Sequence, residues 1–232
     1  MKDFKNKTLL VFGDSIMYGS GNGGVGVGEY LEYNYGFTLK KYCVGGARVG
    51  YDDGKSWIVE QVRQAVSNGE KPDLIVFNGF TNDCNMTDGK NCDVQFGSLS
   101  DSAPTDIFNV EKTNANFTDC FKSICEAFKK YFPQSKVLFV RPHKMGRRGA
   151  DVQIKYGECA VRICKEYGFS VADIYADGKL DTFDEAMRDE YTFDSYNWGR
   201  GDCTHPNAAG YLKFYMPLIG NAVISLFKGE EK

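Results

Sequence analysis

The sequence predicts an α/β fold in which helices cover both faces of a parallel sheet. Short apolar runs alternate along the chain with longer stretches whose apolar residues recur at helical spacing. The short runs are apolar almost throughout, as strands buried on both faces should be. With 232 residues, the chain can bury a full core. We expect one domain over residues 1–232, without an internal repeat or a linker.

The predicted elements follow one another in alternation. The strands are Thr8–Phe12, Thr38–Val44, Leu74–Asn78, Lys136–Arg141 and Ser170–Asp173. The helices are Gly26–Tyr35, Ser56–Ser67, Asn114–Tyr131, Val152–Tyr167 and Asn207–Phe227. In the third helix, Phe117, Phe121 and Phe128 lie at helical spacing and mark an inward face. Crossovers between parallel strands are right-handed, and ligands collect at the carboxyl ends of such strands.

Polar motifs follow the first three strands. They are Gly13-Asp14-Ser15, Val44-Gly45-Gly46-Ala47 and Gly79-Phe80-Thr81-Asn82-Asp83. A fourth motif, Gly201-Asp202-Cys203-Thr204-His205-Pro206-Asn207-Ala208-Ala209-Gly210-Tyr211, leads into the last helix. The rule for parallel sheets therefore predicts that Ser15, Gly46 and Asn82 meet at one edge of the sheet.

The residue types of these motifs suit nucleophilic catalysis. A serine hydroxyl is a poor nucleophile at neutral pH and needs a neighbouring base, for which His205 is the natural candidate. The imidazole must be held in one tautomer by a carboxylate, and Asp202 lies three residues before it. If these residues form one turn ahead of the final helix, ring and carboxylate can meet.

The order and spacing of the four motifs resemble the blocks of the SGNH hydrolases, also called the GDSL esterase/lipase family. The resemblance runs from about Leu9 to about Tyr211. It implies a three-layer α/β/α sandwich with a five-stranded, flavodoxin-like parallel sheet. It also implies a triad of Ser15, Asp202 and His205. We expect no cofactor and no metal. The Ser15 and Gly46 backbone N–H groups and the Asn82 side-chain amide would form the oxyanion hole.

The expected function is that of a serine ester hydrolase working through an acyl-enzyme, removing a small acyl group such as acetyl from a hydrophilic or carbohydrate ester. A lipase, lysophospholipase or thioesterase acting on longer acyl chains is the alternative within the family. A non-catalytic carbohydrate- or ligand-binding protein on the same fold is the alternative of another class. Candidate substrate-binding residues are Asp14, Tyr18, Phe80 and Trp198.

Three further segments could border the site. The polar stretch 84–113 is long for a connection in a compact domain, so it is interpreted as a lid or substrate wall, with disorder as the alternative. The segment Asp181–Arg200 is rich in aromatic residues that could stack on a sugar or pack the loop down. The stretch Gly19–Gly24 matches Gly-x-Gly-x-x-Gly but begins too far from Phe12 for a dinucleotide site, so we expect a mobile rim. The α/β-hydrolase elbow Gly-x-Ser-x-Gly is absent.

Charge and composition exclude several partners. A net charge of −3 argues against nucleic acid, and the basic cluster of Lys144, Arg147 and Arg148 is interpreted as a solvated loop. The amino terminus lacks a signal-peptide pattern, and no apolar run is long enough for a membrane span. We therefore expect a cytoplasmic enzyme acting on a small-molecule ester; the sequence leaves its oligomeric state open.

The eight cysteines are interpreted mainly as buried free thiols. The two pairs that share a helix are five residues apart, which is a poor spacing for a bridge. The Cys84–Cys92 bridge is the least improbable of the possible ones, and Cys84 and Cys203 could line the pocket. Zinc is disfavoured because the chain has no Cys-x-x-Cys pair and only two histidines.

Overall fold

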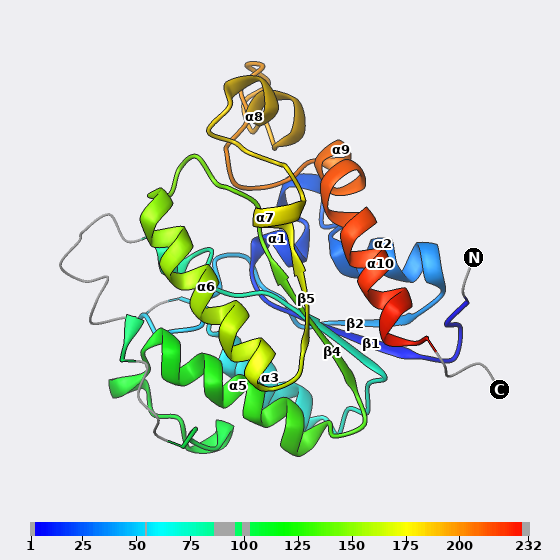
Figure 1. Ribbon diagram of the computed structural model, residues 1–232, viewed down its shortest axis with the longest axis vertical. Helices are drawn as coiled ribbons and strands as arrows, with labels where there is room; N and C mark the ends of the chain where they lie inside the picture. The colour runs from blue at the N-terminus through cyan, green and yellow to red at the C-terminus, as the bar shows by residue number, and fades with distance from the viewer. Residues whose placement is uncertain (1–2, 54, 86–95, 99–102, 229–232) are drawn as a thin grey trace.

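A five-stranded parallel sheet forms the centre of the molecule (Figure 1). The computed structural model describes residues 3–53, 55–85, 96–98 and 103–228. The strand order is β2-β1-β3-β4-β5, and every neighbouring pair is parallel. The strands are β1 (Thr8–Phe12), β2 (Thr38–Lys41), β3 (Leu74–Phe77), β4 (Lys136–Arg141) and β5 (Ser170–Asp173). The predicted α/β class and five-stranded sheet are thus confirmed.

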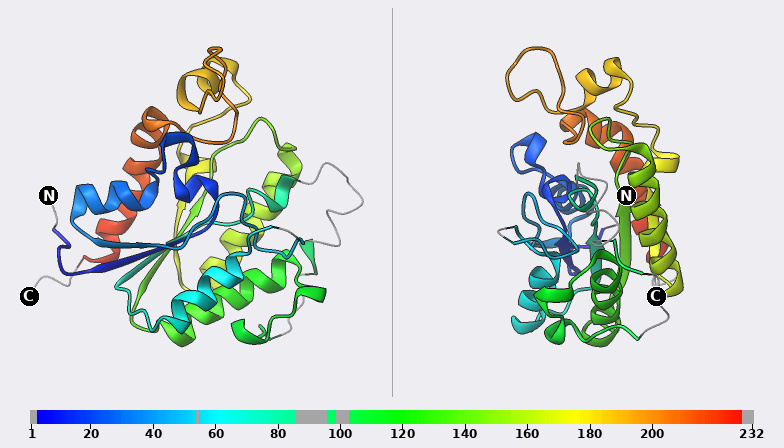
Figure 2. Two further views of the ribbon diagram at one scale, coloured as in Figure 1. Left: turned by 180° about the vertical axis from the view of Figure 1, so that it is seen from behind. Right: turned by 90° about the vertical axis from the view of Figure 1, so that its left-hand side faces the viewer.

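Helices cover both faces of the sheet. The longer ones are α2 (Val27–Tyr35), α3 (Ile58–Ser67), α5 (Phe117–Tyr131), α6 (Ala150–Glu166) and α10 (Met216–Leu226). Helices α2 and α10 pack together against one face, while α3, α5 and α6 cover the other (Figures 1 and 2). This arrangement confirms the three layers implied by the family resemblance.

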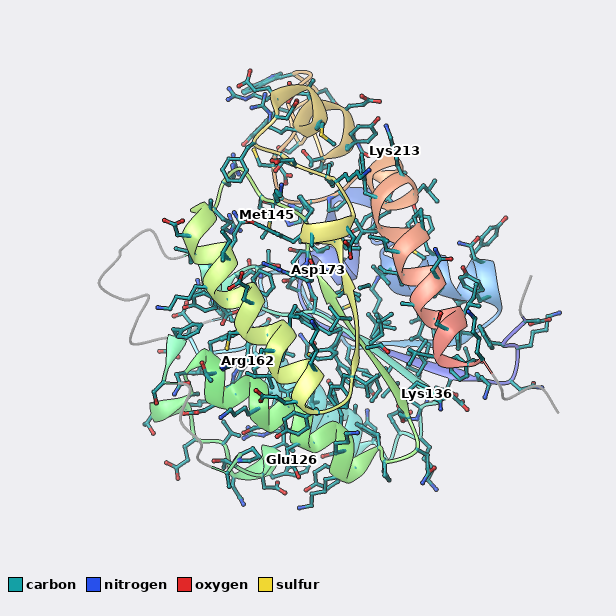
Figure 3. The ribbon with its side chains drawn as sticks, in the orientation of Figure 1. Glu126, Lys136, Met145, Arg162, Asp173 and Lys213 are labelled. Atoms are coloured by element: carbon teal, nitrogen blue, oxygen red, sulfur yellow. The ribbon has the colours of Figure 1, made fainter. Side chains whose placement is uncertain are left out.

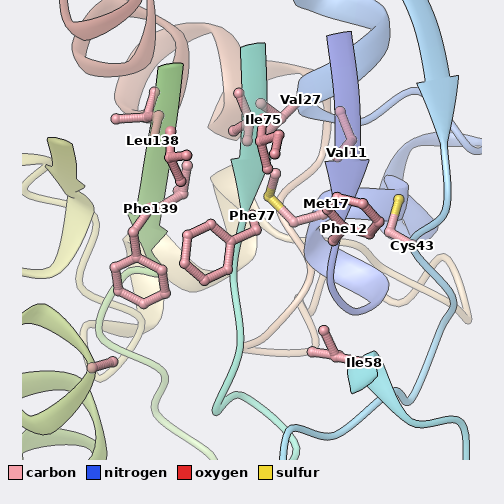
Figure 4. Close-up of a cluster of buried hydrophobic side chains, with 14 of the residues drawn as sticks. Val11, Phe12, Met17, Val27, Cys43, Ile58, Ile75, Phe77, Leu138 and Phe139 are labelled. Carbon is pink, nitrogen blue, oxygen red and sulfur yellow. The ribbon is translucent and has the colours of Figure 1, made fainter. Parts of the chain in front are cut away.

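The core lies between the sheet and these helices. The inner strands β1, β3 and β4 are almost fully buried (Figure 4), and aromatic side chains link them to α5. Phe77 lies 5.1 Å, ring centroid to ring centroid, from both Phe128 and Phe139. The predicted inward face of the third helix is confirmed, because Phe117, Phe121 and Phe128 are buried.

Two predicted strands end earlier than expected. The second stops at Lys41 rather than Val44, since β2 is the edge strand and alternates between exposed and half-buried residues. The third stops at Phe77, because the next residue, Asn78, uses its side-chain amide to bind Asp14. Both ends free the chain to turn at the carboxyl edge of the sheet, where the motifs lie.

Several short elements have no counterpart in the predicted set. They are α1 (Ser15–Tyr18), α7 (Ile174–Asp177), α8 (Glu185–Tyr191), and the short turns η1 (Ser20–Asn22), η2 (Asp83–Asn85), η3 (Ile107–Asn109) and η4 (Lys112–Asn114). Helix α9 (Ala208–Gly210) lies within the predicted final helix. The predicted final helix is divided, with a π-helical turn η5 (Tyr211–Tyr215) ahead of α10. Pro217, near the start of α10, has no N–H to donate to the preceding turn, which favours this widened geometry.

The segment predicted as a lid can be followed only in part. Residues 86–95 and 99–102, with Cys92, lie outside the described residues. The described stretch 103–113 is bound to α3, because Arg63 donates to the carbonyls of Ile107 (2.8 Å) and Val110 (2.7 Å). That stretch therefore packs against the helical layer and does not border the motifs.

The described cysteines outside that segment are free thiols: Cys43, Cys120, Cys125, Cys159, Cys164 and Cys203. Burial raises the pKa of Cys43 to about 12, so this thiol is protonated and inert at neutral pH. Within the described ranges, no helix has both the length and the apolar character needed to cross a membrane.

Candidate active site

Ser15 is held at the first position of α1 by an immobilised turn after β1. Gly13 has φ of 136°, and a Cβ there would lie 1.9 Å from Asn78 Oδ1, so only glycine fits. Gln61 from α3 accepts from the Gly13 N–H and donates to its carbonyl, both at 2.9 Å. The backbone that aims Ser15 is therefore fixed from two sides.

Asp14 lies beneath this turn and not in a pocket, which corrects its prediction as a substrate-binding residue. The side chain is fully buried. Its Oδ1 accepts from the Ile16 N–H at 2.9 Å and from Asn78 Nδ2 at 3.0 Å. A carboxylate at this N-cap position satisfies an orphan N–H of α1, so Asp14 supports the helix that carries Ser15.

Asp202 and His205 meet within one turn ahead of α9, as predicted from their spacing. Asp202 Oδ1 accepts from the backbone N–H groups of Thr204 and His205, each at 2.9 Å. Its Oδ2 lies 2.5 Å from His205 Nδ1, and His205 Nε2 lies 2.8 Å from Ser15 Oγ. The structure thus joins the three side chains in one hydrogen-bonded chain.

The Asp202 side chain is ionised at neutral pH, because its pKa is lowered. Burial acts to raise the pKa of Asp202, but the hydrogen bonds from the His205 side chain and from the His205 and Thr204 N–H groups outweigh it and leave the pKa below its usual value. An ionised Asp202 fixes the Nδ1–H tautomer of His205. His205 Nε2 is then an acceptor for the Ser15 hydroxyl.

A hydrogen bond that does not involve the reacting atoms connects the segment of Ser15 to the segment of His205. The Tyr211 hydroxyl, fully buried, donates to the Ile16 carbonyl at 2.5 Å. Asn207 caps α9 by accepting from the Gly210 N–H at 3.0 Å. The end of the fourth motif therefore docks the last helices onto α1.

Gly46 and Asn82 line the same cavity as Ser15 and His205. This cavity has a volume of about 390 Å³. Asn82 Nδ2 donates one hydrogen to the Ala47 carbonyl at 2.9 Å, and an amide nitrogen carries a second hydrogen. Gly46 has φ of 78°, and the space where a Cβ would stand is open. No three His, Cys, Asp or Glu side chains within the described ranges gather as metal ligands.

Asp83 links the loops that carry Gly46 and Asn82. Its buried carboxyl accepts from the N–H groups of Val49 (3.1 Å) and Gly50 (2.8 Å). Burial raises the pKa of Asp83 to about 6, against the effect of these hydrogen bonds. Asp83 belongs to the third motif, but the sequence predicted no role for it. The structure shows that it bridges two loops.

A second, wider cavity lies beside His205, over the segment between β5 and α9. It has a volume of about 820 Å³ and shares Arg147, Asp202 and His205 with the first cavity. Its other lining residues include Phe183, Phe193, Tyr196, Trp198 and Cys203. Tyr196 and Trp198 are stacked, with centroids 4.6 Å apart, and are 68 % and 77 % exposed. Figure 1 shows α8 and this segment standing beyond the carboxyl edge of the sheet.

The other two predicted substrate-binding aromatics do not line either cavity. Phe80 is 1 % exposed and packs inward, from a backbone with φ of 108°. Tyr18 is partly exposed, and its ring lies under the Lys41 ammonium, 4.2 Å from nitrogen to centroid. Burial of the Phe80 ring corrects the first prediction, while substrate binding by Tyr18, whose ring makes this cation–π contact, stays a prediction.

The basic cluster is only partly a solvated loop. Lys144 lies 3.4 Å from Asp181 in a partly exposed ion pair, and Arg147 is exposed. Arg148, by contrast, is 8 % exposed and lines the cavity of Ser15. For Arg148 the interpretation as a solvated residue is therefore wrong, although a basic residue in a polar turn is usually solvated.

Gly21 contacts His205 and is a second residue that the sequence did not identify. The expected mobile rim is a compact turn, η1, in which Gly21 is buried. A Cβ on Gly21 would lie 2.8 Å from His205 Cβ and 2.7 Å from the Pro206 carbonyl oxygen. Glycine is required at position 21 for lack of space alone, since Gly21 does not have a positive φ.

Gly21→Ala should therefore lower kcat by about 100-fold, because an added methyl group displaces His205 and small misplacements of a catalytic group cost that much. Steady-state hydrolysis of an aryl acetate measures the loss. Gly45→Ala is the matched control, since its Cβ would meet only Ser20 Oγ at 3.7 Å. Equal activities of the two variants would contradict the argument.

His143, the other histidine, should make the protein sensitive to acid. It is fully buried, and its Nδ1 lies 2.7 Å from the Tyr215 hydroxyl. Burial lowers the pKa of His143 to about 4, from an ordinary 6.5. Between these values the unfolded chain binds the extra proton, so stability is lost as the pH falls.

The free energy of unfolding of the wild type, relative to that of His143→Gln, should fall by about 3 kcal/mol from pH 7 to pH 4. Urea titrations at several pH values would measure this difference. The variant contains His205 and Asp83 as well, so their titrations cancel. A difference that stays constant with pH would rule the effect out.

Comparisons with known proteins agree with this geometry. The model of the GDSL-like lipase/acylhydrolase family matches residues 11–213. No curated protein sequence matches the chain.

Solved structures share the fold over nearly the whole chain. A protein from Lactobacillus plantarum is 17% identical, with a TM-score of 0.67 and coverage of 97% of this chain and 98% of its own. Phospholipase A1 from Streptomyces albidoflavus is 15% identical, with a TM-score of 0.55 and coverage of 93% and 99%. An acetyl xylan esterase from Geobacillus stearothermophilus is 16% identical, with a TM-score of 0.54 and coverage of 98% and 97%.

Proposed function

The chain belongs to the GDSL-like lipase/acylhydrolase family, and we propose that it is a serine ester hydrolase that works through an acyl-enzyme. The observation that carries the proposal is the hydrogen-bonded chain from Asp202 through His205 to Ser15 Oγ, at 2.5 and 2.8 Å. Its outer end borders the cavity of Gly46 and Asn82. A nucleophile, its base and an orienting carboxylate are the minimum set for acyl transfer.

In the proposed reaction, Ser15 Oγ attacks the ester carbonyl while His205 Nε2 takes its proton. Asp202 stabilises the imidazolium that forms. The Ser15 N–H, at the first turn of α1 and without an i−4 partner in that helix, would donate to the oxyanion, together with the Gly46 N–H and the Asn82 amide. His205 then protonates the leaving alcohol, and a water molecule, deprotonated by the same ring, releases the acid from Ser15.

We infer that the substrate is a small acyl ester of a hydrophilic alcohol such as a carbohydrate. The leaving alcohol takes its proton from His205, so it lies on the His205 side, where the wider cavity opens. That cavity combines the exposed Tyr196–Trp198 pair with polar side chains, and a flat aromatic face beside hydrogen-bonding groups suits a sugar ring. The structural neighbours named above include an acetyl xylan esterase and a phospholipase A1, so fold alone leaves the acyl length open.

An activity series from acetyl to octanoyl esters of one alcohol tests the acyl length, and kcat/KM should fall as the chain lengthens. For the alcohol, Trp198→Ala should raise KM for an acetylated xylo-oligosaccharide more than for an aryl acetate. Tyr33→Ala is the matched control, because Tyr33 is 88% exposed and lines neither cavity. A maximum at octanoyl esters would favour the lipase alternative. Sugar binding detected by thermal shift, without hydrolysis of any ester, would favour the non-catalytic binding protein.

A further inference from the structure

Two adjacent arginines occupy the turn between β4 and α6, at the carboxyl edge of the sheet. Met145, at the start of this turn, is labelled in Figure 3 and lies between α6 and the α8 segment. Arg147 and Arg148 both line the cavity of Ser15. Counting these arginines, the loop after each of the five strands contributes residues to the two cavities. The proposed acyl transfer, however, uses neither guanidinium group.

Arg148 is a buried cation without a direct ion-pair partner among the described residues, although the charges of Asp14 and Asp202 act to raise its pKa from a distance. Its side chain is 8% exposed, and its Nε donates to the Thr81 carbonyl at 3.1 Å. Within the described ranges no carboxylate forms an ion pair with it, and Nε is the one nitrogen of its side chain that forms a hydrogen bond. Burial lowers the pKa of Arg148, the direction expected for a desolvated charge. Burying an unpaired charge is costly, so a partner from outside the chain would offset that cost.

Arg147 is also without a partner among the described residues, but it is exposed. It lines both cavities, together with Asp202 and His205. It therefore stands where the cavity of the reacting carbonyl meets the cavity assigned to the leaving alcohol. A guanidinium at this junction would face a group attached to the alcohol, close to the ester bond.

The turn that carries the two arginines is held rigidly. Gln153, fully buried on α6, accepts from the Met145 N–H at 2.8 Å. Its Nε2 donates to the carbonyls of Met145 (3.0 Å) and Arg148 (3.1 Å). The Arg148 N–H closes the turn by donating to the Met145 carbonyl at 3.0 Å. Gln61 holds Gly13 in the same way, with a pair of hydrogen bonds to its backbone. Such preorganisation is typical of a binding site.

We propose that Arg147 and Arg148 bind a negatively charged group, a carboxylate or a phosphate, on the alcohol part of the substrate. The planar guanidinium donates two parallel hydrogen bonds to either group. The inference rests on the proposed esterase function and narrows it to esters of anionic alcohols, such as acylated acidic or phosphorylated sugars. The charge on the substrate would also pair the buried cation.

Matched aryl acetates test the proposal. The neutral ester is methyl 4-acetoxybenzoate, and the anionic ones are 4-acetoxybenzoate and 4-acetoxyphenyl phosphate. The readout is the ratio of kcat/KM for an anionic ester to that for the neutral one, compared among enzyme variants. Each ester has a fixed intrinsic reactivity, so differences in leaving-group chemistry cancel in this comparison.

In Arg147→Gln and Arg148→Lys, the ratio should fall about 10- to 100-fold for the better of the two anionic esters, as expected for losing hydrogen bonds to a charged group. Whether the carboxylate or the phosphate shows the larger effect identifies the group. Arg147→Gln alters an exposed side chain and should fold normally. Arg162→Gln is the matched control, because Arg162 lies on α6, is about half exposed and pairs with Glu166; its ratio should equal that of the wild type.

An unchanged ratio in Arg147→Gln and Arg148→Lys, with Ser15 still labelled by a fluorophosphonate, would overturn this proposal and leave the esterase function standing. Equal loss on neutral and anionic esters would also overturn it, since the arginines would then act on the carbonyl or on the Thr81 loop. Failure of the wild type to hydrolyse any ester, without a fluorophosphonate adduct, would instead refute the proposed function itself.

Discussion

Ser15→Ala and His205→Ala should each lower kcat for ester hydrolysis by about 10⁴- to 10⁶-fold, and the double variant should be little worse than either. Ser15 Oγ and His205 Nε2 lie 2.8 Å apart. The serine is not activated without the imidazole, and the imidazole has no nucleophile to deprotonate without the serine. The remaining activity would come from the oxyanion donors and from substrate binding.

The measurement is steady-state hydrolysis, combined with the intact mass after fluorophosphonate treatment. The wild type should gain a single adduct, and Ser15→Ala none. Ser56→Ala is the matched control, since Ser56 is exposed and lines neither cavity. Near-normal turnover in folded Ser15→Ala would show that the nucleophile is another residue.

Much of this site could be predicted because its parts depend on short-range patterns. Strands β1, β4 and β5 have the predicted bounds, and apolar runs of this kind specify buried strands. The carboxyl-edge rule then brings together Ser15, Gly46 and Asn82 from three separate loops. Asp202 and His205 meet because three residues span one turn.

The parts that could not be predicted depend on long-range packing. Asp14 resembles a pocket residue in sequence, but Asn78, 64 residues away, binds it within the core. Gln61 and Gln153 each clamp a functional turn from a helix, and in sequence both resemble surface residues. A glutamine within the apolar stripe of α3 is the one available sign of such a role. No sequence pattern indicated that Arg148 is buried, because its burial depends on the conformation of the turn and not on its neighbours in sequence.

Asp202→Asn should lower kcat by about 10³- to 10⁴-fold, less than the loss of Ser15 or His205, with little change in thermal stability. The reason lies in the two oxygens of this carboxylate. Oδ1 accepts from two backbone N–H groups, so an asparagine must keep its oxygen there. Its NH₂ group then faces His205 Nδ1, in the place of Oδ2.

An NH₂ group opposite Nδ1 forces the imidazole proton onto Nε2. His205 would then donate to Ser15 Oγ and could not accept its proton, so the geometry would persist while the base is lost. NMR of the imidazole N–H would show the proton moved from Nδ1 to Nε2, and kinetics would show the loss. Asp177→Asn, at an exposed position on α7, should have wild-type activity. An Asp202→Asn enzyme within tenfold of the wild type would mean that the Asp202 carboxylate does not set the tautomer of His205.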